Sequence, residues 1–185
     1  MKLIRWCLAM GAGLLLIIPG IWWWRWRWLE HSQDGVIQAA ARRYGMDPAL
    51  VKAVVWKESR FNPKVVGRAG EIGLMQLMDP AAQEWAEAEH VYPMPDEGLF
   101  SPATNTMAGT WYLRKVMQRY RRVDDPVPFA LAEYNAGRGN VLKWASGQAG
   151  TNSEAFVRAI GYPGTRDYVR SIQRRRDRYR GDFPK

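Results

Sequence analysis

Apolar residues recur at helical spacing along most of this chain, and one predicted helix carries a carboxylate on its apolar face. Leu50, Val51, Val54 and Val55 lie eight, seven, four and three residues before Glu58. At 3.6 residues per turn these offsets share one face, so Glu58 should end a stripe directed at the core. Burial there would raise its pKa and keep it protonated near neutral pH. The alternative is a glutamate at a frayed helix end, turned to water or paired with a neighbouring arginine.

The same spacing predicts an all-α domain. The Glu58 helix should begin at Asp47 and Pro48, since aspartate caps a helix and proline suits its first position. The predicted helices cover residues 36–44, 48–59, 79–88, 105–120, 127–134, 139–144 and 165–179. Loops rich in Gly, Pro, Ser and Asp are expected at 62–73, 90–102 and 146–154. No alternating run is long enough to predict a sheet, although residues 67–76 could form a minor hairpin.

Residues 1–30 have a different character. From Trp6 to Trp24 no residue is charged, a run of 19, which is just long enough to cross a bilayer. Tryptophans and arginines alternate at its end, as is typical of a membrane–water interface. We interpret residues 1–30 as an uncleaved transmembrane anchor and residues 31–185 as one catalytic domain. A cleaved signal peptide is the alternative, but no small-residue cleavage site follows the apolar run. Cys7, the only cysteine, precedes that run and is on the wrong side for lipid attachment.

The charge of the chain is strongly basic. Its formal net charge is +9, and four basic residues and one acidic residue precede residue 31, which leaves +6 on the remainder. The densest part is the C-terminal run of arginines from Arg166 to Arg180. This run is either a solvated helix face or a surface that attracts peptidoglycan carboxylates or membrane headgroups. No recognition motif accompanies the charge, so nucleic acid is not a predicted partner. His31 and His90 lie in no metal-ligand pattern, and neither a metal nor a cofactor is predicted.

Three segments, taken together, resemble a known enzyme family. They are residues 58–63 (ESRFNP), 69–78 (AGEIGLMQLM) and 132–137 (AEYNAG). In this order and at these separations they are similar to the signature segments of the soluble lytic transglycosylases, which cleave the glycan strands of bacterial peptidoglycan. The resemblance spans roughly residues 34 to 180 and implies a lysozyme-like helical fold.

The resemblance also implies a mechanism that needs a single carboxylate. Glu58 would protonate the glycosidic oxygen between N-acetylmuramic acid and N-acetylglucosamine, and the muramoyl N-acetyl group would stabilise the charge at C1. The ionised Glu58 would then deprotonate the C6 hydroxyl of the sugar, which closes a 1,6-anhydro ring. Most glycoside hydrolases use two carboxylates instead, and Glu71, Asp79, Glu84 and Glu133 are the nearby candidates for a second one.

The substrate-binding residues implied by the resemblance are Met75, Gln76, Tyr134, Asn135 and Tyr168. Met75 would line the cleft and Gln76 would offer its amide to the sugars. Tyr134 would reach Glu58 with its hydroxyl and help to set the pKa of that acid. Asn135 would either hold loops together or bind an acetamido group.

Three positions depart from the family's usual pattern. Gly67 stands where a serine is usual, Glu133 replaces an alanine, and Gly164 replaces a substrate-contacting glutamate. We expect these three changes to affect the affinity of individual sugar-binding subsites more than cleavage of the glycosidic bond.

The sequence therefore predicts a membrane-anchored lytic transglycosylase of the bacterial inner membrane, with its catalytic domain in the periplasm and peptidoglycan strands as its partner. Two rival interpretations remain. One is a hydrolytic muramidase, in which water attacks instead of the C6 hydroxyl. The other is a catalytically inactive wall-binding or assembly module with an unknown envelope partner, against which the presence of Glu58, Gln76 and Tyr134 argues.

Overall fold

The computed structural model describes residues 24–92 and 98–183, and the chain divides into two units, residues 1–33 and 34–185. In the first unit, residues 24–31 are helical, and Trp24, Trp26 and Trp28 are all exposed. The predicted membrane-crossing run lies outside the described residues except for Trp24. Among the residues that are described, no helix has both the length and the apolar character needed to cross a bilayer.

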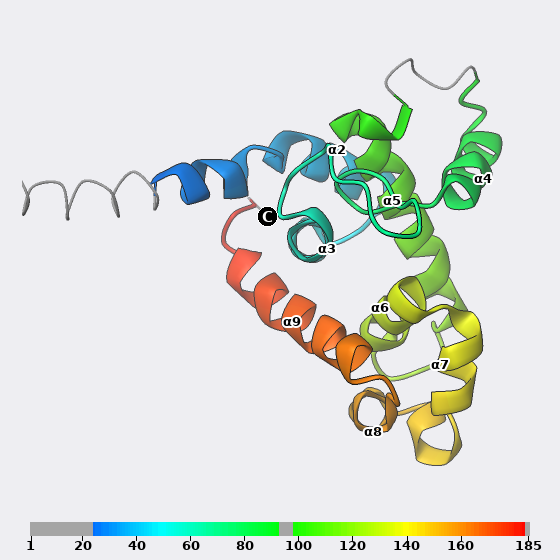
Figure 1. The fold of residues 1–185 in the computed structure, drawn as a ribbon. Coiled ribbons are helices and arrows are strands. Elements are labelled where there is room, and N and C mark those ends of the chain that lie inside the picture. Colours follow the sequence, from blue (N-terminus) through cyan, green and yellow to red (C-terminus); the bar gives the residue numbers. More distant parts are fainter. Residues whose placement is uncertain (1–23, 93–97, 184–185) are drawn as a thin grey trace, which may run out of the picture. The chain divides into compact units, whose positions relative to one another are not determined.

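The second unit is built from helices, as its sequence pattern predicts (Figure 1). The α-helices are α2 (Asp34–Tyr44), α3 (Pro48–Ser59), α4 (Asp79–Glu89), α5 (Pro102–Arg119), α6 (Pro126–Ala136), α7 (Arg138–Trp144), α8 (Ser153–Ala159) and α9 (Pro163–Tyr179). Two short 3₁₀ helices, η1 (Gly98–Phe100) and η2 (Gly147–Gly150), lie in the connections. The described part of the chain contains isolated β-bridges but no extended strand.

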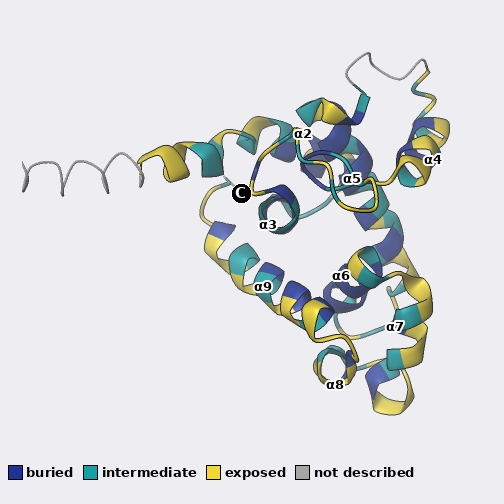
Figure 2. Ribbon diagram, in the orientation of Figure 1, coloured by how far each residue is buried: buried dark blue, intermediate teal, exposed yellow. Residues whose placement is uncertain are grey.

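Helix α3 lies at the centre of the packing. It contacts α9 and α2, and α5 contacts both α2 and α6. Its residues Leu50, Val51, Val54 and Val55 are at most 1% exposed, and burial extends around most of the helix (Figure 2). This extensive burial shows that α3 is largely enclosed within the domain, with α9 and α2 as its main neighbours.

Paired cap and proline residues start three of these helices. The side chains of Asp47, Ser101 and Asp125 accept hydrogen bonds from backbone N–H groups of the first turn, and a proline follows each one. The predicted cap at Asp47 is confirmed. Ser101 caps α5 in the same way, so α5 begins at Pro102, three residues before the predicted start at residue 105. Asp79 is the first residue of α4 and not its cap, because Met78 takes the cap position without a side-chain bond.

Two connections differ from the predicted loops. Residues 153–159 form helix α8, where a loop was expected to residue 154, because Asn152 caps the helix through the N–H of Ala155. The hairpin expected near residues 67–76 is present only as two antiparallel bridges, which join Ile72 to Val66 and to Leu77.

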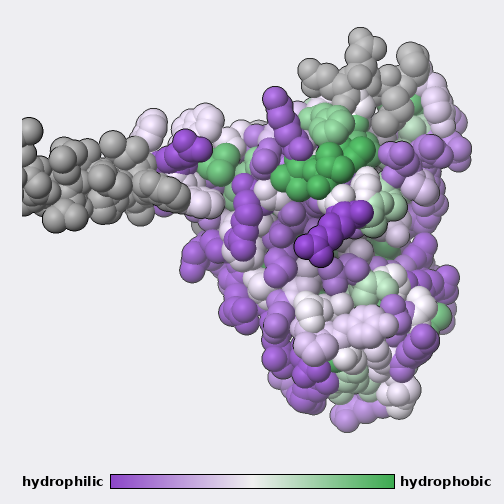
Figure 3. Space-filling model, in the orientation of Figure 1, coloured by the Kyte–Doolittle hydropathy of each residue, from purple (hydrophilic) through white to green (hydrophobic). Residues whose placement is uncertain are grey.

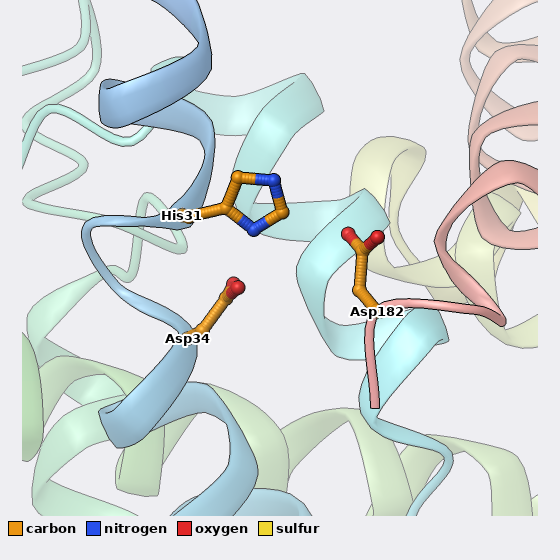
Figure 4. A group of neighbouring side chains, drawn as sticks. All are labelled: His31, Asp34 and Asp182. Carbon is orange, nitrogen blue, oxygen red and sulfur yellow. The ribbon is translucent and has the colours of Figure 1, made fainter. Parts of the chain in front are cut away.

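A buried lysine joins the start and the end of this unit. The side chain of Lys52 is fully buried, and its Nζ lies 2.7 Å from Oδ1 of Asp34 and 2.7 Å from Oδ2 of Asp182. Asp34 begins α2 and Asp182 follows α9, so the two carboxylates come from opposite ends of the unit (Figure 4). Because a buried ammonium requires paired charges, this cluster fixes the end of α9 against α3.

The arginine run occupies α9, which is buried on one side and exposed on the other (Figure 2). Arg175 stacks on the ring of Trp56 at 3.9 Å, and Arg176 forms an ion pair with Asp47 at 2.6 Å. Arg170 and Arg174 are exposed, and the surface over α9 is largely hydrophilic on the face drawn in Figure 3. Part of the run therefore docks α9 onto α3, and the rest forms a solvated basic face.

Candidate active site

Glu58 lies in the last turn of α3, as predicted, and is partly buried. The helix ends directly after it, because Arg60 adopts a left-handed conformation with φ of 54° and caps the carbonyl of Trp56. Arg60 is also held by its guanidinium, which stacks on the Trp56 ring at 3.7 Å. The end of α3 is thereby fixed, and Glu58 with it.

The partner of the Glu58 carboxyl is Tyr168. The Tyr168 hydroxyl donates a hydrogen bond to Oε1 of Glu58 at 2.5 Å, and the Tyr168 side chain is 3% exposed. Tyr168 lies on α9, which packs against α3. The sequence predicted Tyr168 as a substrate-binding residue and assigned the contact with Glu58 to Tyr134.

Glu58 has the electrostatics of a general acid. Burial raises its pKa from the ordinary 4.5 to about 7, and the negative charge of Glu71 acts in the same direction. The hydrogen bond from Tyr168 and the charge of Lys57 lower the pKa, but burial is the largest effect. A carboxyl with a pKa near neutral can hold a proton, donate it, and take another back.

The expected contact between Tyr134 and Glu58 is not present as a hydrogen bond. The Tyr134 hydroxyl donates instead to the backbone carbonyl of Met75 at 2.8 Å, and its ring packs edge-on against Tyr112. Tyr134 comes from α6 and approaches the loop that follows α3, and burial raises the pKa of its hydroxyl. Its position fixes that loop to α6.

The Met75 side chain does not line an open surface, in contrast to the prediction. It is fully buried, and a Cβ added at Gly109 would lie 2.5 Å from its sulfur. Gly109 thus makes room on α5 for Met75. The role of Met75 in this structure is to anchor the loop in the core.

Gln76 uses its amide nitrogen within the loop. Its Nε2 donates to the carbonyl of Gly73 at 2.9 Å and to that of Val65 at 3.1 Å. Gln76 also has a positive φ of 47°, which is unusual for a residue with a side chain. The loop therefore takes both amide hydrogens, so the predicted contact of Gln76 with a sugar would have to use the amide oxygen.

Asn105 is a positioning residue that the sequence analysis did not identify. It is completely buried on α5, and its Oδ1 accepts from the N–H of Met75 at 2.7 Å. Its Nδ2 donates to the carbonyls of Ile72 and Leu99 at 2.8 and 2.9 Å. A Cβ at Gly73 would lie 2.3 Å from this nitrogen, so glycine is needed for the close approach. An asparagine among the apolar residues of a buried helix is the signal that could have revealed it.

Asn135 connects two helices. The Thr165 hydroxyl donates to Oδ1 of Asn135 at 2.8 Å, which ties the end of α6 to the first turn of α9. Of the two predicted roles, the structure shows the one that holds segments together. Gly164, the neighbouring departure from the family pattern, is exposed and has open space where a side chain would project.

Two of the carboxylates considered for a second catalytic role, Glu133 and Glu84, form ion pairs. Glu133 is 3% exposed and binds the Arg119 guanidinium and the Tyr120 hydroxyl, both at the end of α5. Glu84 pairs with Lys115. The negative charge of Glu133, at a position where the family usually has alanine, is therefore balanced by the positive charge of Arg119.

Comparison with protein families identifies the chain. The Transglycosylase SLT domain model matches residues 35–157, which include Glu58, the loop after α3 and Tyr134. The chain belongs to this family. The expected resemblance is confirmed, and the matched residues stop before α9, which supplies Tyr168.

Relatives of this SLT-family chain include the soluble lytic murein transglycosylase of Salmonella typhimurium, with 37% identity over 127 residues. The match covers 65% of this chain and 18% of that protein. The chain thus corresponds to a small part of the curated relative it matches.

Solved structures show the same all-helical, lysozyme-like fold. The 70-kDa soluble lytic transglycosylase of Escherichia coli matches with a TM-score of 0.71 and 30% identity, over 80% of this chain and 24% of that one. A complex of the 70-kDa soluble lytic transglycosylase with bulgecin A gives a TM-score of 0.72 and 30% identity, over 83% of this chain and 25% of that one. An inactive variant of lytic transglycosylase Slt from Pseudomonas aeruginosa gives a TM-score of 0.74 and 24% identity, over 82% of this chain and 24% of that one.

Proposed function

We propose that this protein is a peptidoglycan lytic transglycosylase that uses Glu58 as its acid and then as its base. The observation that carries the proposal is a carboxyl with a pKa raised to about 7, held by Tyr168 in a member of the SLT family. The soluble lytic murein transglycosylase relative supports murein as the substrate.

A single residue can carry out both proton transfers of this reaction. Glu58 gives its proton to the glycosidic oxygen as the bond between N-acetylmuramic acid and N-acetylglucosamine breaks. The ionised carboxylate then takes the proton of the C6 hydroxyl while O6 bonds to C1, which leaves a 1,6-anhydro end. A pKa near 7 suits both steps, because the same group must release and recover a proton.

Two measurements test this function. Glu58→Gln keeps the shape of the side chain but cannot donate a proton, so clearing of purified sacculi should fall at least ~10²-fold. Near-normal clearing by a folded variant would remove Glu58 from the mechanism. Mass spectrometry of the released fragments separates the two chemistries, since anhydro ends indicate a transglycosylase and reducing ends, heavier by one water, indicate a muramidase.

For the rest of the chain, our proposal is that residues 1–30 anchor the enzyme in the bacterial inner membrane and that residues 31–185 act on the wall from the periplasmic side. The uncharged run from Trp6 to Trp24 supports the anchor. The exposed Trp26 and Trp28, with Arg27 between them, fit the headgroup region that would follow it.

A further inference from the structure

The end of helix α3 carries a cation on each side of Glu58 along the chain. Lys57 directly precedes Glu58, and Arg60 follows it by two residues. The C-terminus of a helix has a partial negative charge, which favours cations at these positions. The local sequence therefore places two positive side chains next to the acid of the candidate active site.

Lys57 lies close to the tyrosine that binds the acid. Its ammonium is 5.9 Å from the centre of the Tyr168 ring, within the range of a cation–π contact. The hydroxyl of the same tyrosine donates to the Glu58 carboxyl at 2.5 Å. Lys57 is half-buried, whereas Arg60 is exposed. The ammonium of Lys57 thus lies at the edge of the candidate active site.

The guanidinium of Arg60 is held by an aromatic ring. It stacks on Trp56 at 3.7 Å, and Arg175 stacks on the same residue at 3.9 Å. Arg175 comes from α9, which packs against α3 (Figure 1). Stacking orients the plane of a guanidinium but does not use its N–H groups. The N–H groups of the exposed Arg60 therefore remain available to an anion.

The positive charges of this group repel one another. Burial lowers the pKa of Arg60, and the charge of Arg175 lowers it further. A lowered pKa means that the charged form is disfavoured by its surroundings. An anion bound beside these side chains would reduce the repulsion.

Other cations of α3 and of the end of α9 have carboxylate partners. The ion pairs join Lys52 to Asp34 and Asp182, Arg176 to Asp47, and Arg180 to Asp177. Within the part of the chain that the structure describes, the side chains of Lys57 and Arg60 form neither an ion pair nor a hydrogen bond. The cations nearest to Glu58 in the chain are thus without a carboxylate from the protein itself.

We propose that Lys57 and Arg60, with Arg175 beside them, bind carboxylates of the glycan strand, and that this site favours strands that carry stem peptides. The inference rests on the proposed function, which makes peptidoglycan the substrate. A stem peptide adds carboxylates to muramic acid, the sugar at which the strand is cleaved. A guanidinium can bind a carboxylate through two parallel hydrogen bonds, and a lysine ammonium binds it as a point charge.

Binding of defined glycan strands tests the proposal. Full-length protein with Glu58→Gln is used so that the strands are not cleaved, and calorimetry measures the affinity for three probes. The first is strands with intact stem peptides. The second is the same strands after their carboxylates have been converted to amides. The third is strands freed of stem peptides by an amidase, which keep only the lactyl carboxylate of muramic acid. The intact strands should bind most tightly.

Replacement of both cations gives the central comparison. Lys57→Gln with Arg60→Gln should weaken binding of intact strands about fivefold or more and leave little preference over amidated strands. The cap of α3 is the backbone N–H of Arg60, so it does not depend on the side chain that is replaced. Lys57→Arg with Arg60→Lys keeps both charges and should keep the preference. The matched control is Arg170→Gln with Arg174→Gln, which removes two exposed arginines of α9 and should also keep it.

A preference for intact over amidated strands that survives Lys57→Gln with Arg60→Gln would overturn the proposal. An equal loss in the Arg170 and Arg174 control would also overturn it, because the whole basic surface would then attract the strand. Equal binding of intact and peptide-free strands would place the lactyl carboxylate in the site and exclude selection of stem peptides.

These outcomes are distinct from a failure of the proposed function. If Glu58→Gln cleared sacculi normally while the preference for intact strands still depended on Lys57 and Arg60, the catalytic role of Glu58 would fail and the carboxylate site would stand. If Glu58→Gln abolished clearing while the preference did not depend on these cations, the reverse would hold.

Discussion

The Tyr168 hydroxyl donates a hydrogen bond to the carboxyl of Glu58 from a position 110 residues further along the chain. Glu58 lies in the last turn of the buried helix α3, and Tyr168 lies on α9. The acid therefore has its present environment only when α9 is docked on α3, which Lys52 and the stacking of Arg175 on Trp56 secure.

Loss of this hydrogen bond should change the pH profile. The bond lowers the pKa of Glu58, so Tyr168→Phe should raise that pKa above about 7 and move the alkaline limb of activity to higher pH. The rate should also fall, because the carboxyl loses the contact that orients it. A pH–rate profile of sacculus clearing measures both, and a lower rate with an unmoved limb would show that Tyr168 contacts only the sugar.

Tyr134→Phe is the control variant for Tyr168→Phe. Because its hydroxyl bonds to the Met75 carbonyl, the variant should leave the alkaline limb where it is in the wild type. It should lower the free energy of unfolding by about 1 kcal/mol, the net value of a typical hydrogen bond. A limb that moved as far as in Tyr168→Phe would contradict the structure's assignment of these two tyrosines.

The raised pKa of Glu58 also predicts how stability depends on pH. The folded state keeps the proton up to about pH 7, whereas the unfolded chain releases it near 4.5, so ionisation of Glu58 opposes folding as pH rises through this window. Glu58→Gln removes this effect. The unfolding free energy of Glu58→Gln should therefore exceed that of the wild type by an amount that grows from near zero at pH 4 to about 3 kcal/mol at pH 8. Urea denaturation at a series of pH values measures this difference. A constant difference across this range would mean that Glu58 titrates normally.

Asn105 should be important for the loop that carries Gln76. Asn105→Ala leaves the N–H of Met75 and the carbonyls of Ile72 and Leu99 without their partner in the core. We expect a loss of about 3 kcal/mol or more of unfolding free energy, since each buried unsatisfied group costs ~1–3 kcal/mol. Asn140→Ala on α7 removes a bond to the Ala136 carbonyl and one from the Tyr162 hydroxyl, neither of them in the core, and as the control it should cost less. Similar losses for both would indicate that Asn105 is not a central support.

The proposed anchor makes a separate prediction. A spanning helix is held by burial and not by screened charge, so the full-length protein should stay with membranes through a high-salt wash. Fractionation followed by N-terminal sequencing measures this. Release by salt, or an N-terminus that begins after Trp28, would contradict the anchor.

Local signals in the sequence were enough to predict the helices with strong caps and the burial of the α3 face. Asp47 and Pro48 start α3 through bonds that involve only near neighbours, and helical spacing alone places Val51, Val54 and Glu58 on one side. Where the signal was weaker, as for α8, the cap residue Asn152 was present but too little of the segment was apolar to mark a helix.

The sequence by itself determined the helical class, the position of Glu58 and the family segments, because these depend on residues close together in the chain. Only the tertiary structure decided that Tyr168 and not Tyr134 binds Glu58, that Asn105 supports the loop, and that Glu71 fills the space above Gly67. The physical reason is that these contacts depend on how α5, α6 and α9 approach α3, and spacing within one segment carries no information about the residue that another segment brings to it.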